Sequence, residues 1–147
     1  MTEIVTPSRQ KRPEFRNIHA FKDLPSYRLP PAGWVSILHR ISGAIMFLLL
    51  PFIIWMFDVS VSSEISFIKF KSAFEFGMLG LPGVIWKLLA LAIIWAYVHH
   101  LIAGLRHLWM DARHAVSKEF GKSSAIFTLT LGSLITLALA LKLVGAY

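Results

Sequence analysis

The 147-residue sequence contains no cysteine, and only 16% of its residues are charged. Without cysteine, the chain can form no disulfide and can hold no thiolate-ligated metal or iron–sulfur cluster. The low charge, together with 56% hydrophobic residues and a mean hydropathy of +0.63, is unlike a soluble domain of this length. Any redox chemistry must therefore use a cofactor held by other ligands, and six histidines are available.

Acidic residues are also scarce, with 8 Asp and Glu against 15 Lys and Arg, for a formal charge of +7. The basic residues lie outside the apolar runs, and the sequence has no interleaved aromatic and basic patch typical of nucleic-acid binding. The positive charge is instead typical of a membrane surface. No short apolar segment followed by a small-residue cleavage site lies near the N-terminus, so we expect no cleaved signal peptide.

Three apolar stretches approach the roughly 20 residues that cross a bilayer core. We expect transmembrane helices at about residues 34–57, 84–110 and 124–144. Pro51 lies inside the first stretch and should kink it, because proline removes a backbone donor. The sequence therefore predicts an all-α integral membrane protein, with an anchor domain at 32–147 behind a basic N-terminal arm at 1–31.

The distribution of Lys and Arg predicts the orientation of these spans. The N-terminal arm and the loop after the second span carry most of the cations, whereas the connector 58–83 carries only Lys69 and Lys71. By the positive-inside rule, the N-terminus and the second loop should be cytoplasmic, or matrix-side in an organelle. We expect the location to be a bacterial inner membrane. Within the connector, residues 65–78 mix apolar and charged positions and could form an amphipathic helix at the interface.

One face of the second span carries four unusual residues, which are His100, Gly104, His107 and Asp111. They share a face because successive helical residues are rotated by about 100°. Ionisable groups at membrane depth are costly and often mark a ligand, cofactor or proton path. Imidazole is a standard axial ligand of haem iron, and a glycine one turn away leaves room for a porphyrin face. The alternative is a histidine that hydrogen-bonds across a helix interface beside a packing glycine.

His99 competes with His100 for such a role. The two are rotated by about 100°, so only one can face the same cofactor. His99 shares its stripe with Arg106, whereas His100 shares its stripe with Gly104. This favours His100 as a ligand and His99 as a packing or hydrogen-bonding residue.

Two further pairs stand near the cytoplasmic ends of the spans. Ser36 and Arg40 lie one turn apart, and they could bind quinone carbonyl oxygens, a carboxylate or a lipid phosphate. The alternative for Arg40 is an interfacial side chain that reaches toward water. Asp111 follows His107 by one turn, so this pair could relay a proton or simply cap the helix end.

Two segments together resemble the succinate dehydrogenase cytochrome b subunit family. Ser36–Gly43 is similar to its SxxHRxSG motif, and His100–Asp111 is similar to its HxxxGxRHxxxD motif. The order and separation of the motifs, the three-span layout and the chain length also resemble this family, over roughly residue 28 to the C-terminus. The resemblance implies the large membrane anchor of respiratory complex II, in a heterodimeric helical bundle with a smaller anchor.

The resemblance also implies partners and cofactors. A flavoprotein and an iron–sulfur protein would pass electrons from succinate to ubiquinone, which links the citric acid cycle to the respiratory chain. A b-type haem, as in a cytochrome b556, would be shared with the smaller anchor, and this chain would hold no catalytic residue for succinate oxidation. A fumarate reductase anchor and a cofactor-free structural anchor are the alternatives.

The resemblance assigns roles to individual residues of this chain. His100 would be the axial ligand of the haem iron, and the second ligand would come from the partner. The other haem contacts would be His39, Arg40, Gly104 and His107. The quinone site would contain Ser36, Ile37, Arg40 and Asp111.

Overall fold

A computed structural model describes residues 19–23, 26–115 and 117–145, and within them the chain is helical with no β-strand. Most of the predicted N-terminal arm lies outside the described residues. The helices are α1 (Ala20–Asp23), α2 (Pro31–Leu48), α3 (Leu50–Val61), α4 (Glu64–Glu75), α5 (Gly83–Arg113) and α6 (Lys118–Leu143). The predicted all-α fold is confirmed.

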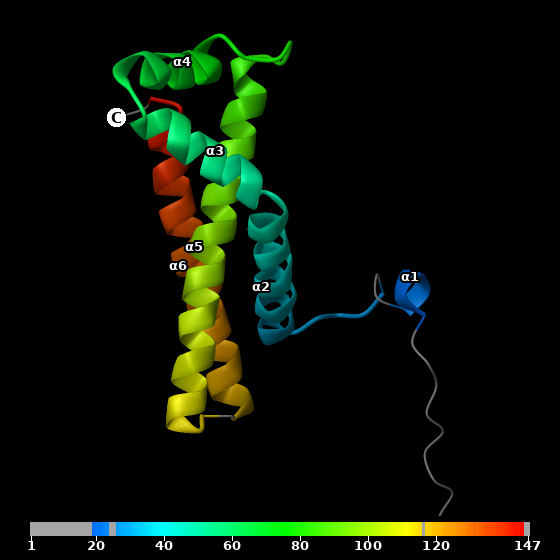
Figure 1. Cartoon of the computed structure of the whole chain (residues 1–147). Coiled ribbons are helices and arrows are strands. Elements are labelled where there is room, and N and C mark those ends of the chain that lie inside the picture. Colours follow the sequence, from blue (N-terminus) through cyan, green and yellow to red (C-terminus); the bar gives the residue numbers. More distant parts are fainter. Residues whose placement is uncertain (1–18, 24–25, 116, 146–147) are drawn as a thin grey trace, which may run out of the picture.

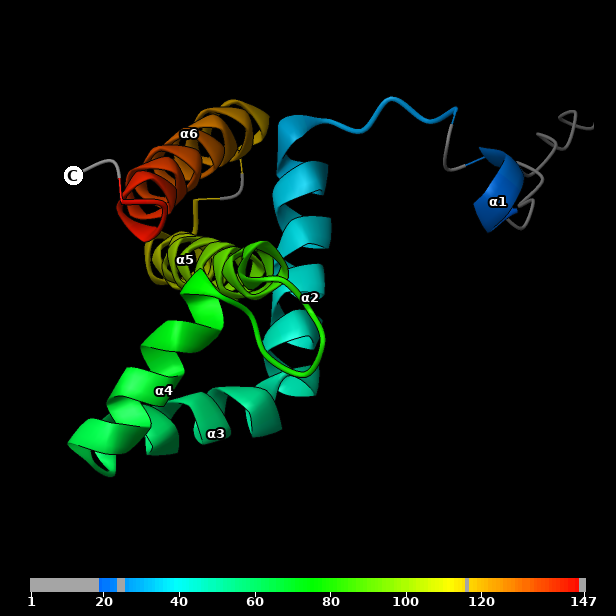
Figure 2. The same cartoon turned by 90° about the horizontal axis from the view of Figure 1, so that it is seen from above.

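The longest helix, α5, organises the molecule. It packs against α2, α4 and α6, and α2 also contacts α6 (Figure 1). Seen from above, α2 and α6 lie on different sides of α5 (Figure 2), and α4 lies at one end of α5 (Figure 1). Two helices, α5 and α6, are long and apolar enough to cross a membrane, and α2 with α3 passes the same test as one bent pair. This agrees with three spans, of which the first is broken.

The break in the first span has a clear local cause. The axes of α2 and α3 differ by 57°, and Leu49 separates the two helices. Pro51 lies in the first turn of α3, where its missing N–H costs nothing to α3 but prevents α2 from continuing. The predicted kink is therefore confirmed. Beyond it, the ring of Phe52 stacks on that of Trp86 in α5, with centroids 5.8 Å apart.

The connector between the first two spans forms a capped helix and a tight turn. Ser63 caps α4 through a capping box with Ser66. The helix ends before the predicted 65–78 boundary because Gly77 has a positive φ of 99°. The indole N–H of Trp86 donates to the Met78 carbonyl (3.2 Å) and ties this turn to α5.

The hairpin of α5 and α6 extends beyond the apolar runs that predicted it. Helix α5 ends at Arg113, where His114 adopts a left-handed conformation (φ 51°, ψ 33°). Helix α6 begins at Lys118, and the Ser117 hydroxyl accepts from the Phe120 N–H (3.2 Å). The helices extend past the loop ends of the spans predicted at 84–110 and 124–144, because hydropathy marks membrane depth whereas caps mark helix ends.

The three long helices meet at small side chains. Val35, Ala103 and Ala125 form a fully buried cluster, against which Ala32 and Leu129 pack. Small residues let helix backbones approach closely, as is common where helices cross in membranes. The large apolar side chains point mostly outward, for example Phe47 at 76% exposure. The outer faces are therefore suited to lipid or to other helices.

The start of α5 yields a test of this packing. A Cβ on Gly83 would clash with the Phe74 carbonyl oxygen in α4, so Gly83→Ala must push α4 away from α5. We expect a loss of about 1–3 kcal/mol in stability, seen as a lower thermal unfolding midpoint of the purified protein. The matched control is Gly121→Ala, because nothing lies within 4 Å of that Cβ. An unchanged midpoint for Gly83→Ala would contradict the α4–α5 corner.

Candidate functional site

Helices α2 and α5 bring three histidines together, and we call this group the histidine cluster: His39, His100 and His107. The rings of His39 and His100 are stacked, with centroids 4.1 Å apart and an interplanar angle of 22°. His107, two turns along α5 from His100, has its ring centroid 5.3 Å from that of His39 and tilted by 47°. The two sequence motifs thus form one site, with His39 between two residues of the α5 stripe.

The ring of His100 is held by the backbone of α2. Its Nδ1 lies 3.0 Å from the His39 carbonyl oxygen and 3.2 Å from the Ser42 hydroxyl, which itself donates to that carbonyl (2.9 Å). A carbonyl oxygen can only accept, so this contact requires the proton on Nδ1 of His100. The Nε2 lone pair of His100 is then available to a metal. Metal-ligating histidines usually donate their other ring N–H to a backbone carbonyl, a carboxylate or water, as Nδ1 of His100 does here.

Gly43 makes this arrangement possible. A Cβ at that position would lie 2.9 Å from Cε1 of His100, closer than real contacts allow. Glycine therefore lets the imidazole lie directly against α2. Ser42 and Gly43 received no role from sequence reasoning beyond their place in the motif. Their neighbour His100 is 58 residues from Ser42 along the chain, so only the fold could reveal the contact.

Gly104 provides a bare patch of helix beside the histidine cluster. A Cβ on Gly104 would meet only Nε2 of His39, at 3.7 Å, which is an ordinary contact. This Nε2 is buried and has no hydrogen-bond partner among the described residues. Buried polar atoms are nearly always paired, so an unpaired one beside a bare helix face calls for an additional polar partner. An acidic group of a ligand would supply that partner.

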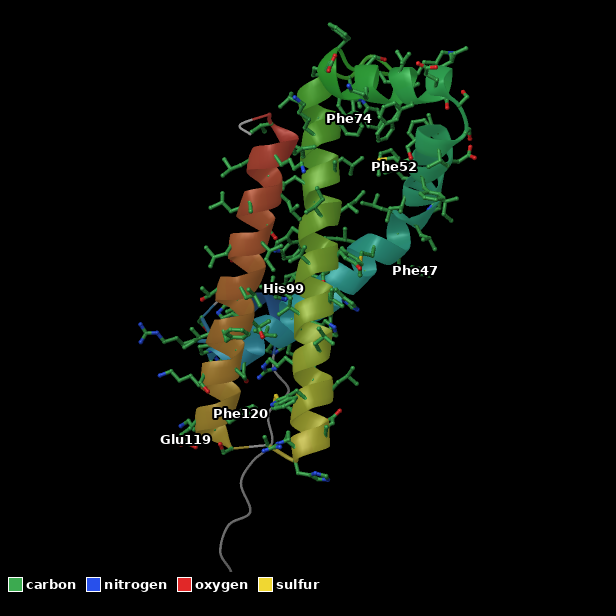
Figure 3. The ribbon with its side chains drawn as sticks, turned by 90° about the vertical axis from the view of Figure 1, so that its left-hand side faces the viewer. Phe47, Phe52, Phe74, His99, Glu119 and Phe120 are labelled. Carbon is green, nitrogen blue, oxygen red and sulfur yellow. The ribbon has the colours of Figure 1, made fainter. Side chains whose placement is uncertain are left out.

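His99 points away from the histidine cluster, as its 100° rotation predicts. It is only 3% exposed and lies where α5 and α6 face each other, close to α2 (Figure 3). Its ring stacks on Trp95 (5.6 Å, 18°), and Gly132 of α6 leaves room for it. Its Nε2 is buried and, like that of His39, has no hydrogen-bond partner among the described residues. His99 is thus enclosed between the helices, whereas His100 is half-buried and is the more accessible imidazole.

Ser36 and Arg40 form a second polar pair on α2. The Nη2 of Arg40 lies 3.5 Å from the Ser36 hydroxyl oxygen, at the outer limit of a hydrogen bond. Arg40 is exposed, and Ser36 and Ile37 are half-buried in the turn before it. This weak contact leaves most guanidinium N–H groups and the hydroxyl proton free for a ligand.

Asp111 forms no hydrogen bond with the other predicted quinone residues, which are Ser36, Ile37 and Arg40. It lies in the last turn of α5, it is exposed, and its carboxylate makes no hydrogen bond or ion pair within the part of the chain described. His107 and Asp111, which the sequence allows to relay a proton, are not hydrogen-bonded to each other, and the His107 ring lies beside that of His39. Asp111 is thus a solvent-facing carboxylate one turn away from the histidine cluster.

The chemistry of this donor set favours a prosthetic group over a bare metal ion. No three His, Asp or Glu side chains among residues 19–23, 26–115 and 117–145 are grouped to hold a metal ion. A porphyrin brings its own four equatorial ligands and needs only axial ones, such as the Nε2 of His100. The residues present fit such a group, because Gly104 leaves a flat face and His39 and Arg40 offer partners to its carboxylates.

Comparison with known proteins agrees with the motifs. Residues 9–140 match the family described as succinate dehydrogenase/fumarate reductase transmembrane subunit. The chain is 34% identical over 118 residues to the succinate dehydrogenase cytochrome b556 subunit of Coxiella burnetii, a match that covers 80% of this chain and 89% of that one. It is 31% identical over 118 residues to the cytochrome b556 subunit of Paracoccus denitrificans, which covers 80% and 85% of the two chains. The corresponding cytochrome b560 subunit of Reclinomonas americana is 29% identical over 114 residues, which is 78% of each chain.

The contact between Gly43 and His100 can be tested against Gly104. Gly43→Ala should push the His100 ring off the His39 carbonyl and cost about 1–3 kcal/mol in stability. Gly104→Ala should leave stability unchanged or raise it by up to about 1 kcal/mol, since alanine favours helix and meets only an ordinary contact. Thermal unfolding of the two variants in mild detergent measures the difference. Equal midpoints would show that His100 does not lie against α2.

Proposed function

The chain belongs to the succinate dehydrogenase/fumarate reductase transmembrane subunit family, and from this premise we propose that it is the large membrane anchor of a succinate:quinone oxidoreductase. In this role it provides one side of a b-type haem site and part of a ubiquinone-reduction site. The observation that carries the proposal is the orientation of His100, whose Nδ1 is held by the His39 carbonyl while Nε2 remains free to ligate iron.

The haem site is built from the histidine cluster and its neighbours. His100 would ligate the haem iron, and a histidine of the smaller anchor would supply the second ligand. When bound, the haem supplies one-electron storage between the iron–sulfur protein and the quinone. Gly104 gives the macrocycle a face to lie on. His39, whose buried Nε2 lacks a partner among the described residues, His107 and the fixed positive charge of Arg40 meet the carboxylate edge.

The quinone site is built around Ser36 and Arg40. A hydroxyl and a guanidinium within one helical turn can both donate to one quinone carbonyl oxygen. The charge of Arg40 lowers the cost of the negative charge that develops on that oxygen as the quinone is reduced. Ile37, next to Ser36, contributes apolar contact to the quinone ring.

Reduction of a quinone to a quinol also consumes two protons. Asp111 faces solvent and can exchange protons with water, and we assign it to the entry of a proton path. His107 stands one turn deeper and touches the histidine cluster, so it can pass a proton inward through water. This division of roles explains why a carboxylate remains at a helix C-terminus, where the helix dipole disfavours it.

The proposed assembly contains a flavoprotein, an iron–sulfur protein and a smaller membrane anchor. The flavoprotein and the iron–sulfur protein dock on the cytoplasmic face of a bacterial inner membrane. We assign the N-terminus, the Ser36–Arg40 pair in α2 and Asp111 in α5 to this same face. The exposed apolar faces of α2 and α3 offer the surface that a second anchor requires. The direction of physiological turnover is decided by comparing succinate–ubiquinone and fumarate–quinol rates of the purified complex.

The haem assignment is tested by removing one imidazole. His100→Ala should reduce the reduced-minus-oxidised b-type absorbance of the purified complex to background, because the ring that ligates iron is gone. The matched control is His114→Asn, which removes an exposed imidazole but tolerates its left-handed backbone, and it should keep the full spectrum. An unchanged spectrum in His100→Ala would transfer the ligand role to His99.

The quinone assignment is tested by removing one hydroxyl. Ser36→Ala should lower kcat/KM for ubiquinone about fivefold to tenfold, the value of one hydrogen bond to a reacting oxygen. Succinate-dependent reduction of an artificial dye at the soluble subunits should not change. Ser60→Ala, which removes a hydroxyl bonded only to the Phe57 carbonyl, is the control. If ubiquinone reduction survives both Ser36→Ala and Arg40→Leu, the chain is a purely structural anchor.

A further inference from the structure

A long groove runs between α5 and α6, on the side of α5 away from Gly104. Its volume is about 840 Å³, and its lining is mostly apolar. Phe120 and Trp109 stand near its loop end, and Leu131 lies furthest along α6 from that end. The proposed haem and quinone sites use none of these residues.

One cation lies in this groove. The Nε of Arg106 donates to the Ser124 hydroxyl (2.9 Å), and its Nη2 donates to the Gly121 carbonyl (3.2 Å). These two bonds join α5 to α6 but bring no negative charge. Within the described part of the chain no carboxylate pairs with Arg106 and its Nη1 donates no hydrogen bond. A half-buried guanidinium in an apolar setting requires an anionic partner from elsewhere.

The position of Arg106 along α5 corresponds to the level of lipid phosphates. It follows directly after the uncharged run Leu88–Leu105, which spans about 27 Å of helix and so nearly fills a bilayer core of about 30 Å. The groove therefore has its cation at the edge of the hydrocarbon region and extends on both sides of it, with Leu131 on the deeper side and Ala112 toward the loop. An anionic headgroup at Arg106 with one acyl chain toward Leu131 matches this layout.

The rim of the groove adds further positive charge. The Arg113 guanidinium lies 5.6 Å above the Trp109 ring, which lines the groove. Lys118 and Lys122 are exposed on the first turns of α6. The acidic residues at this end of the hairpin are the exposed Asp111 and Glu119, so cations predominate.

We propose that the groove between α5 and α6 binds one anionic phospholipid, with its phosphate on Arg106 and one acyl chain along the apolar lining. Basic pockets between transmembrane helices on the cytoplasmic side recognise anionic headgroups in this way. The N-terminal arm of this chain is a poor occupant, because residues 9–16 carry four cations and one acid and would repel Arg106. The same argument disfavours the basic loop end of a second copy.

Native mass spectrometry of the intact complex, purified in mild detergent and depleted of lipid, tests this proposal. Added dioleoyl phosphatidylglycerol should bind with a stoichiometry of one per chain and more tightly than dioleoyl phosphatidylcholine. Arg106→Gln keeps a donor for Ser124 but removes the charge, and it should weaken phosphatidylglycerol binding about fivefold. Lys142→Gln, at the other end of α6, is the matched control and should not change it. Inorganic phosphate at millimolar concentration should not displace the lipid.

A second variant keeps the test decisive if Arg106→Gln fails to assemble. Ala112 lines the groove and is exposed, so Ala112→Trp should block it while Arg106 stays in place. Wild-type phosphatidylglycerol affinity in the assembled variants would overturn the proposal, and so would displacement by free phosphate.

The natural chain has no cysteine, so Leu108→Cys provides a unique reporter. An oxidative disulfide between two copies through Leu108→Cys would show that a second copy fills the groove and would also overturn the proposal.

Discussion

The hydrogen bond between Nδ1 of His100 and the His39 carbonyl is the contact on which the rest of the site depends. It requires α2 and α5 to approach so closely that only Gly43 fits beneath the imidazole ring. It also fixes the proton on Nδ1, so one backbone oxygen sets both the position and the tautomer of the proposed iron ligand. Because the carbonyl belongs to His39, the same contact keeps the first motif in register with the second.

This close approach is supported by small side chains where α2, α5 and α6 meet. Val35, Ala103 and Ala125 bring α2 and α6 onto α5 with almost no side-chain volume between the backbones. The stacked pair of His99 and Trp95 then fills the interior beside Gly132. The neighbouring histidines thus have different tasks, because one faces the three-helix interior and the other faces α2.

Much of this architecture could be predicted from the sequence, because membrane-spanning helices are recognised by the length and hydropathy of their apolar runs. The kink at Pro51, the shared face of His100 and Gly104, and the divergence of His99 follow from local geometry. The extent of α5 and α6 could not be predicted from hydropathy, because these helices continue into the polar phase until His114 and Ser117 cap them. The partnership of Ser42 and Gly43 with His100 depends on tertiary contact, and the turning of His107 toward His39 instead of Asp111 depends on side-chain packing.

The small volume of the buried cluster has a consequence for the stability of the isolated subunit. The three helices that meet at Val35, Ala103 and Ala125 bury little side-chain volume where they pack. Large side chains such as Phe47 and Leu48 are instead about three-quarters exposed. Buried van der Waals contact is the main source of helix association in lipid, so this subunit alone has little of it to lose. Contact of its outer faces with lipid or with other helices would therefore add most to the stability of this subunit.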